Sequence, residues 1–258
     1  MPQPSLEQQI VKRFRKACFD YQLIEDGDHV LVALSGGKDS LCLLEMMALQ
    51  SRIHKPKFSV EAVHVRMENI TYETSTDYLE RFCQHLGVSL HVLTTRFEIG
   101  EDADVSLSTT RSQLLHKQKT PCFLCSWNRR KQIFNLAQAL HCNKIALGHH
   151  MDDIIHTTLL NEFFQGRFEG MLVRLKMKKM PLTIIRPLCL CHENDIKAYA
   201  DARGYQKQVK RCPYEHDTHR RAIAQLFHHV EQLNSEARFS IWNALQKASK
   251  LVDDDNNE

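Results

Sequence analysis

Six consecutive residues, Ser35-Gly36-Gly37-Lys38-Asp39-Ser40, carry the groups that bind a chain of phosphates. The two glycines let the backbone turn tightly and point successive N–H groups at an anion, and Lys38 adds a full positive charge. Ser35 and Ser40 add hydroxyl donors, and Asp39 is suited to hold a phosphate-bound Mg²⁺. The spacing is not that of a Walker A loop. The alternative is a glycine turn capped by serine and aspartate.

Two cysteines, Cys122 and Cys125, are separated by two residues, a spacing that lets both sulfurs face one metal ion. They precede a predicted helix whose first residues include Arg129, Arg130 and Lys131. The helix N-terminus and these cations are expected to lower the thiol pKa values. Four interpretations of this spacing remain open: a redox or persulfide pair, a zinc half-site, an iron–sulfur half-site, and a chance spacing in a chain with nine cysteines.

A metal site needs a further ligand, and Cys212 is the best candidate because it lies in a loop beside basic residues. Cys189 and Cys191 are alternatives, but they adjoin a predicted strand whose alternation buries at least one of them. The remaining cysteines fall within helical patterns and are expected to be buried thiols: Cys18, Cys42, Cys83 and Cys142.

A third polar cluster, Gly148-His149-His150-Met151-Asp152-Asp153, follows an apolar run that reads as a strand. Ligands bind at the carboxyl ends of strands in open α/β sheets, so these side chains are candidates for nucleotide contact. Asp152 could equally be a helix N-cap. Arg129, Arg130 and Arg186 are candidates for substrate or phosphate contact, although a structural ion pair would explain each of them as well.

Short apolar runs alternate with helical periodicity along the chain. This predicts a doubly covered, Rossmann-like parallel sheet, with crossover helices on both faces. Strands are expected at 30–34, 58–65, 89–95, 144–150 and 183–188. Helices are expected at 5–24, 41–50, 75–87, 126–141, 152–166 and 192–204, with a wholly helical segment from 216 onward. Residues 98–121 lack a clear period and are expected to form a mobile flap.

Composition describes an ordinary globular protein of 258 residues, 43% hydrophobic and 25% charged, with a net charge of +3. We expect an N-terminal helix (1–27), an ATP-binding domain (28–206) and a C-terminal cysteine loop with a helical appendage (207–258). No secretion signal or membrane-spanning run is visible, which predicts a cytoplasmic protein that binds no membrane. Basic clusters at 12–16, 174–179 and 207–211 are compatible with a polyanionic partner.

The hexapeptide 35–40, directly after the apolar run 30–34, resembles the PP-loop of the N-type ATP pyrophosphatases. Together with residues 119–130, 144–153 and 185–188, and with Cys212, the chain resembles the tRNA 2-thiocytidine synthetases from about residue 20 to residue 212. The cysteine pattern is more specific than the PP-loop, which many activities share.

This resemblance implies a 4Fe-4S cluster held by Cys122, Cys125 and Cys212, with one iron left open. It implies that ATP and Mg²⁺ adenylate O2 of a cytidine in the anticodon loop of tRNA, and that sulfur from a cysteine desulfurase displaces AMP. Lys38, Asp39 and Asp152 would be catalytic. The PP-loop residues 35–40 would bind the nucleotide together with Gly148, His149 and Asp153. A homodimer is a further expectation.

Three departures from the family pattern bear on which nucleotide is modified rather than on the reaction type. Glu215 stands where many relatives place another cysteine, Met151 replaces a polar or basic residue, and residues 66–72 do not match the expected pattern. The tail from Cys212 onward also diverges. Alternative functions are a cluster-free tRNA thiolase that uses a persulfide, a lysidine-type tRNA ligase, and an iron–sulfur or nucleotide sensor.

Overall fold

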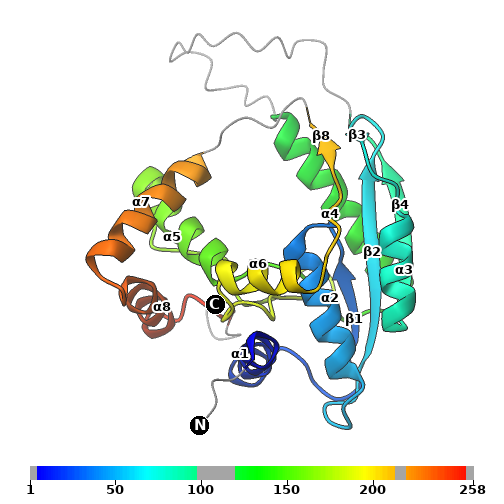
Figure 1. Ribbon diagram of the computed structural model, residues 1–258, viewed down its shortest axis with the longest axis horizontal. Helices are drawn as coiled ribbons and strands as arrows, with labels where there is room; N and C mark the ends of the chain where they lie inside the picture. Colours follow the sequence, from blue (N-terminus) through cyan, green and yellow to red (C-terminus); the bar gives the residue numbers. More distant parts are fainter. Residues whose placement is uncertain (1–4, 98–119, 213–218, 254–258) are drawn as a thin grey trace.

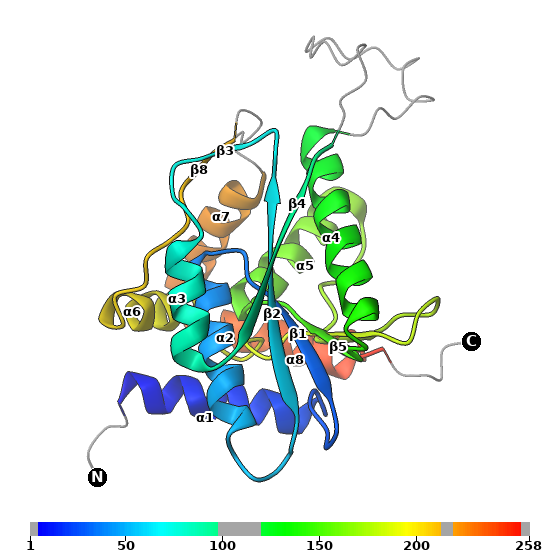
Figure 2. The same cartoon turned by 90° about the vertical axis from the view of Figure 1, so that its right-hand side faces the viewer.

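The run of apolar residues before the glycines forms β1, which lies at the centre of a six-stranded sheet (Figures 1 and 2). The computed structural model describes residues 5–97, 120–212 and 219–253. The strand order is β4-β2-β1-β5-β7-β6, and every pairing is parallel except that of β6 with β7. The chain runs outward from β1 to β2 and β4 and then returns to β5 on the other side. Such a reversal leaves a crevice at the carboxyl ends of β1 and β5.

The helices are α1 (Leu6–Asp20), α2 (Lys38–Ser51), α3 (Asp77–Leu86), α4 (Pro121–Ala139), α5 (Met151–Gln165), α6 (Glu193–Ala202), α7 (His219–Leu233) and α8 (Ala237–Lys247). The strands of the sheet are β1 (His29–Ala33), β2 (Ser59–Met67), β4 (Ser89–Thr95), β5 (Lys144–Ala146), β6 (Arg174–Lys176) and β7 (Thr183–Ile185). Outside this sheet, β3 (Thr71–Tyr72) and β8 (Lys210–Arg211) form a separate antiparallel pair.

Both faces of the sheet are covered by helices. Alternate residues of the central strands point to opposite faces, so each face has an apolar core of its own. Val30 and Val32 belong to an apolar core shared with α1, α2, α5 and α6. Leu31 and Val63 belong to a second core, which α4 closes with Ala137. In Figure 2, α4 lies on one side of the sheet, and α2 and α3 lie on the other. The predicted fold class is therefore confirmed.

Several boundaries differ from the sequence-based prediction for local reasons. We expected a helix from residue 126, but α4 already begins at Pro121, with the hydroxyl of Thr120 accepting a hydrogen bond from the N–H of Phe123. Proline suits the first turn because no intrahelical partner is needed there. The expected strand 144–150 ends at Ala146, and the short strands β3, β6 and β8 were not predicted. Except for Thr120 and Pro121, the expected flap lies outside the described residues.

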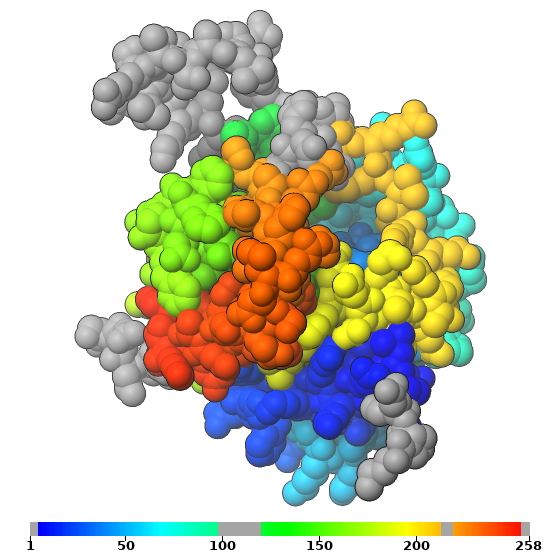
Figure 3. Space-filling view, turned by 60° about the vertical axis from the view of Figure 1, so that its left-hand side comes forward, coloured from blue at the N-terminus to red at the C-terminus, as the bar shows by residue number. Residues whose placement is uncertain are grey.

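The C-terminal helices pack onto the rest of the protein through α5 and the larger core. Phe227 of α7 and Trp242 and Leu245 of α8 are buried in that core, and the indole of Trp242 donates to the hydroxyl of Tyr21 at 3.1 Å. Figure 3 shows a hollow between α7 (orange) and the yellow segment that leads to β8. None of the described helices combines the length and apolar character needed to cross a bilayer.

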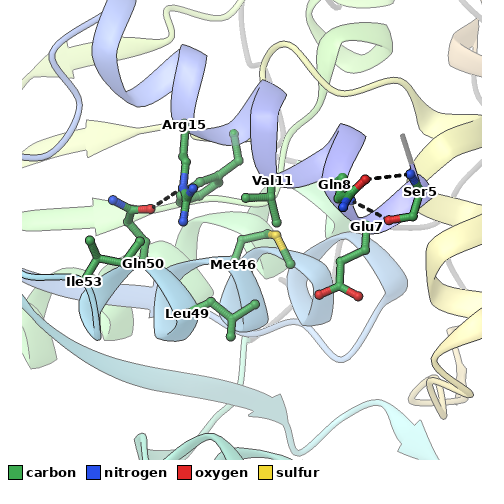
Figure 4. Close-up of a pocket in the computed structure, with 10 residues that line it drawn as sticks. Ser5, Glu7, Gln8, Val11, Arg15, Met46, Leu49, Gln50 and Ile53 are labelled. Carbon is green, nitrogen blue, oxygen red and sulfur yellow. Dashed lines mark hydrogen bonds between the residues drawn. The ribbon is translucent and has the colours of Figure 1, made fainter. Parts of the chain in front are cut away.

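A groove of about 490 Å³ lies between α1 and α2 (Figure 4). Met46, Leu49 and Ile53 line it from α2 and the residues after it, and Arg15 of α1 donates to the side chain of Gln50. These residues lie at the end of α2 away from the glycine loop. The groove is therefore separate from the site described next.

Candidate nucleotide and thiol site

The six-residue loop forms the turn from β1 into α2, as the sequence predicted. Gly36 has a φ of +82°, which favours glycine, and Gly37 is the N-cap of α2. The hydroxyl of Ser35 lies 3.0 Å from that of Ser40 and accepts from the N–H of Gly37 at 3.3 Å. The loop thus leads directly into a helix whose first N–H groups and positive dipole end suit a phosphate.

Lys38 lies at the mouth of this loop, between two carboxylates. Its Nζ is 3.0 Å from an oxygen of Asp39 and 3.0 Å from an oxygen of Glu193. Burial would lower the pKa of Lys38, but the two carboxylates outweigh it and raise the pKa above its ordinary value. The amine is therefore a full cation, and a phosphate could replace the partly exposed Glu193 as its partner.

The cluster after β5 lies directly against the phosphate loop. A Cβ on Gly148 would come within 3.1 Å of the backbone of Asp39, a tight contact that favours glycine at this position. The ring of His150 lies 3.8 Å from Asp39, 3.5 Å from Asp152 and 3.4 Å from Asp153. Burial would lower the pKa of His150, but the close contact with Asp152 and the negative charges of Asp153 and Asp39 raise it.

The two aspartates of this cluster differ in what they contact. Asp153 accepts from the N–H of His150, the N-cap of α5, at 3.1 Å, and its side chain is 28% exposed. Asp152 is 5% exposed and accepts from the N–H of Glu193 at 2.8 Å and from Arg238 at 2.6 Å. Burial would raise the pKa of Asp152, but His150 and Arg238 hold it well below its ordinary value. Asp152 is therefore ionised and held by protein groups.

The buried Arg186 and the partly buried His149 form a pair next to His150. Nε of Arg186 donates to Nδ1 of His149 at 3.2 Å, and its guanidinium also donates to the carbonyl oxygen of Leu172. Burial, and then the charge of Arg186, lower the pKa of His149 to about 4. His149 is therefore a neutral imidazole near neutral pH, held in place by a buried cation.

Two of the three cysteines named from the sequence, Cys125 and Cys212, share one apolar cluster. Cys125 and Cys212 pack against the same apolar cluster of Met67, Ile70 and Phe97, while Cys122 is exposed one turn earlier on α4. Cys212 and Cys122 both act electrostatically on the Cys125 thiol. Within the described ranges, no three histidine, cysteine or acidic side chains stand close enough to hold an ion.

The expected lowering of the thiol pKa is wrong for Cys125. Burial raises the pKa of this thiol, and the charges of Arg129 and Lys210 offset only part of the effect. Cys189 and Cys191 are fully buried in the larger core, where burial raises the pKa of both thiols. Of the three candidates for a third ligand, Cys212 is the one that packs beside Cys125.

Four residues beside the site were not singled out from the sequence: His64, Tyr72, Glu193 and Gln208. Tyr72 accepts from Arg129 at 3.1 Å, and the N–H of Gln208 donates to the carbonyl oxygen of Gly36 at 3.0 Å. Glu193 could have been found, because it opens the helix after the last predicted strand. The other three lie on segments that reach the loop only through contacts between parts of the chain that are far apart in the sequence.

Comparison with known proteins agrees with this geometry. A PP-loop domain matches residues 4–230. A tRNA-cytidine(32) 2-sulfurtransferase from Pseudomonas putida (strain GB-1) is 31% identical over 254 residues, which cover 97% of this chain and 88% of that protein. A protein of the same name from Bordetella avium (strain 197N) is 33% identical over 254 residues, covering 97% of this chain and 76% of that protein.

Among solved structures, the U34-tRNA thiolase NcsA from Methanococcus maripaludis with its 4Fe-4S cluster matches with a TM-score of 0.70 and 20% identity. The match covers 94% of this chain and 79% of that one, and it shows the fold. The sequence relationships reach further, because they span nearly the whole chain and include the phosphate loop. The chain belongs to the PP-loop family and, within it, to the family of the tRNA-cytidine(32) 2-sulfurtransferases.

Proposed function

We propose that this protein is an ATP-dependent tRNA sulfurtransferase that converts a cytidine of the anticodon loop into 2-thiocytidine. The observation that carries this proposal is that two short segments connect the phosphate loop to the thiols. Gln208, which bonds Gly36, lies four residues before Cys212, and Arg129 of the adjoining cavity lies one helical turn after Cys125. Relatives at 31% identity are named for cytidine 32 of tRNA, and we propose the same nucleotide.

The first step is adenylation of the substrate. O2 of the cytidine attacks the α-phosphorus of ATP, the bond to the β-phosphate breaks, and pyrophosphate leaves. The backbone of residues 35–40 and the N-terminus of α2 would bind the departing pyrophosphate, and Lys38 would neutralise charge that develops on it. The carbonyl oxygen is thereby turned into a leaving group, AMP.

Mg²⁺ would be held by Asp39 and Asp153. Both side chains are about one-third exposed, and both lie within 4 Å of the ring of His150. Carboxylate oxygens combined with phosphate oxygens are the usual ligands of Mg²⁺ in nucleotide sites. Asp152 would serve the reaction by orienting His150, because its own oxygens are engaged by Arg238 and by the N–H of Glu193.

The second step is displacement of AMP at C2 by a sulfur nucleophile, with cleavage of the carbon–oxygen bond. Cys122, Cys125 and Cys212 would hold a 4Fe-4S cluster, and the chemistry that such a cluster would supply here is delivery of the sulfur nucleophile. The site suits such a group because Cys125 and Cys212 share an apolar cluster with cations nearby. Lys210, which lines the neighbouring cavity, would contact tRNA phosphate.

The test is to purify the protein without oxygen and measure iron, sulfide and zinc, followed by nucleoside analysis of tRNA incubated with ATP and sulfide. Iron and sulfide near four per chain and ATP-dependent 2-thiocytidine are the expected results. A colourless, iron-free protein that still thiolates tRNA would replace this mechanism with a persulfide thiolase. Pyrophosphate release without thiolation would favour a ligase.

Three expectations about partners and location stay predictions. A cysteine desulfurase is expected to supply the sulfur, and mixing it with this protein and labelled cysteine would reveal transfer. Size-exclusion chromatography with light scattering would test the homodimer. Fractionation of cells would test the cytoplasmic location.

A further inference from the structure

The carboxyl ends of β1 and β2 enclose a cavity of about 240 Å³ beside the phosphate loop. Ser35 and Gly37 of the loop form one side of it, and Val63, Val65 and Ile133 contribute apolar walls. A slot with apolar walls next to a phosphate site suits a flat heteroaromatic ring. Under the proposed function, this ring is the base of ATP.

Three residues of this cavity carry a buried polar atom that has no hydrogen-bond partner within the described part of the chain. These atoms are Nε2 of His64, Nε of Arg129 and Oε1 of Gln208. Buried polar groups in folded proteins are nearly always paired, because an unpaired one loses its hydration without compensation. Their presence around one cavity indicates a polar ligand that completes them.

The chemistry of His64 at this position is fixed by its other ring nitrogen. Nδ1 lies 2.7 Å from the carbonyl oxygen of Leu34, which can only accept, so Nδ1 carries the proton. The side chain is 2% exposed, and burial lowers its pKa, which keeps the ring neutral. Nε2 is therefore a lone-pair acceptor held in one orientation.

We propose that His64 selects the base of the nucleotide by accepting a hydrogen bond from the 6-amino group of adenine through Nε2. This inference rests on the proposed function, since it deepens the same ATP site. Arg129 supplies the matching donor for a ring nitrogen of the base. A 6-oxo purine presents an oxygen lone pair to Nε2 instead of a proton, which leaves both acceptors unpaired.

The experiment compares nucleotides on the intact protein with Mg²⁺ and without tRNA, by isothermal titration calorimetry. The probes are ATP, ITP, purine riboside triphosphate, which has no group at position 6, and 2′-deoxy-ATP. We expect wild-type protein to bind ATP at least about tenfold more tightly than ITP or the purine riboside. Equal affinities would overturn the proposal without any variant.

His64→Asn removes the acceptor at Nε2 while its amide can still donate to Leu34. ATP affinity should fall about tenfold, and affinity for purine riboside triphosphate should change little. His29→Asn is the matched control, because His29 opens β1 at the end of the strand away from the cavity. That control should keep the preference for ATP, and thermal unfolding of both variants checks that they are folded.

The remaining outcomes are distinct. If His64→Asn weakens ATP and the purine riboside equally, the side chain does not recognise the base, and the proposal is wrong. If the variant instead loses discrimination between ATP and 2′-deoxy-ATP, Nε2 serves the ribose, and the assignment to adenine is overturned. A wild-type protein that binds no nucleotide would refute the proposed function itself.

Discussion

Charged side chains at the start of α2 and α5 are packed more tightly than surface charges normally are. Lys38 contacts two carboxylates and His150 contacts three, all around one loop. Such clusters occur at sites that bind a further charged ligand, because the protein alone leaves like charges close together. Single side chains of this cluster and its surroundings should therefore affect nucleotide binding and the pH dependence of stability.

Lys38→Ala should lower ATP-dependent release of pyrophosphate by at least about a hundredfold, since the departing charge loses its cation. Iron content should be unchanged, because the cysteines are untouched. The measurement is pyrophosphate release in the presence of tRNA. Lys197→Ala is the control, because Lys197 pairs only with Asp201 on the exposed face of α6 among the contacts described. Full activity of Lys38→Ala would refute the role of the loop.

His149 makes stability depend on pH in a defined window. Its pKa is about 4 in the folded protein and 6.5 ordinarily, so below pH 6.5 the unfolded chain takes up a proton that the folded chain does not. Stability should fall by about 2 kcal/mol as pH drops from 6.5 to 4, with no effect above that window. Urea unfolding of His149→Asn should show a flatter profile there, whereas exposed His85→Asn should follow wild type.

At the scale of elements, the segment before Cys212 is attached to the phosphate loop. Gln208 bonds Gly36 through its backbone, and its side-chain amide donates to the carbonyl oxygen of Ser75 at 2.6 Å. Two residues later, β8 pairs with β3 and places Lys210 opposite Tyr72. A change in the loop therefore affects β8, the strand that directly precedes Cys212.

Gly36→Ala should weaken ATP binding and disturb this segment. A Cβ at this position would lie 2.4 Å from Cγ of Gln208, in addition to the strain of a positive φ. Gly27→Ala is a matched control, since Gly27 also has a positive φ but faces open space. The positive φ should cost each variant about 1 kcal/mol of stability, and the clash with Gln208 should add to the loss in Gly36→Ala. ATP titrations should show a loss of affinity only for Gly36→Ala; equal affinities would contradict this coupling.

Cys212→Ala should remove the cluster and tRNA thiolation while leaving the fold intact. Cys212 is partly exposed beside Cys125, so truncating it removes little packing. Iron analysis and circular dichroism measure the two effects. Cys189→Ala is the control. Because Cys189 is buried, this variant should lose about 1 kcal/mol or more of stability, but it should retain its iron. Full iron retention by Cys212→Ala would show that Cys212 is not a ligand of the cluster.

For the whole molecule, a buried ion pair ties the C-terminal helices to the nucleotide site. Arg238 of α8 contacts Asp152 at 2.6 Å and Glu231 of α7 at 2.7 Å, with its side chain 11% exposed. Phe227 and Trp242 lie in the same apolar core as β1. The division of the chain near residues 27 and 206 stays a prediction. Residues on both sides of these boundaries share one apolar core.

Arg238→Met should destabilise the protein by about 3 kcal/mol, because Asp152 is left buried without its main cation. It should also lower ATP affinity through the displaced His150. Urea unfolding and calorimetry measure these effects. Lys250→Met removes an exposed ion pair with Glu169 and should cost well under about 1 kcal/mol. Equal losses of stability in the two variants would show that the buried ion pair stabilises the protein no more than the exposed one.

The sequence by itself determined the local chemistry and the elements that carry it. Glycines at 36 and 37 after an apolar run specify a phosphate turn at a strand end, and the strand at 89–95 was predicted to the residue. These features depend on neighbours along the chain, so periodicity and turn chemistry suffice to find them. Membership of the family also follows from short motifs of this kind.

Only the tertiary structure decided which side chains act together. The carboxylate of Asp152 serves α6 and α8, which lie about 40 and more than 80 residues away in the sequence. Burial raises the pKa of the Cys125 thiol by more than Arg129 and Lys210 lower it, and one cavity is lined by both His64 and Gln208, which are far apart in the sequence. Burial and long-range pairing fix these properties, and neither leaves a periodic signal in the chain.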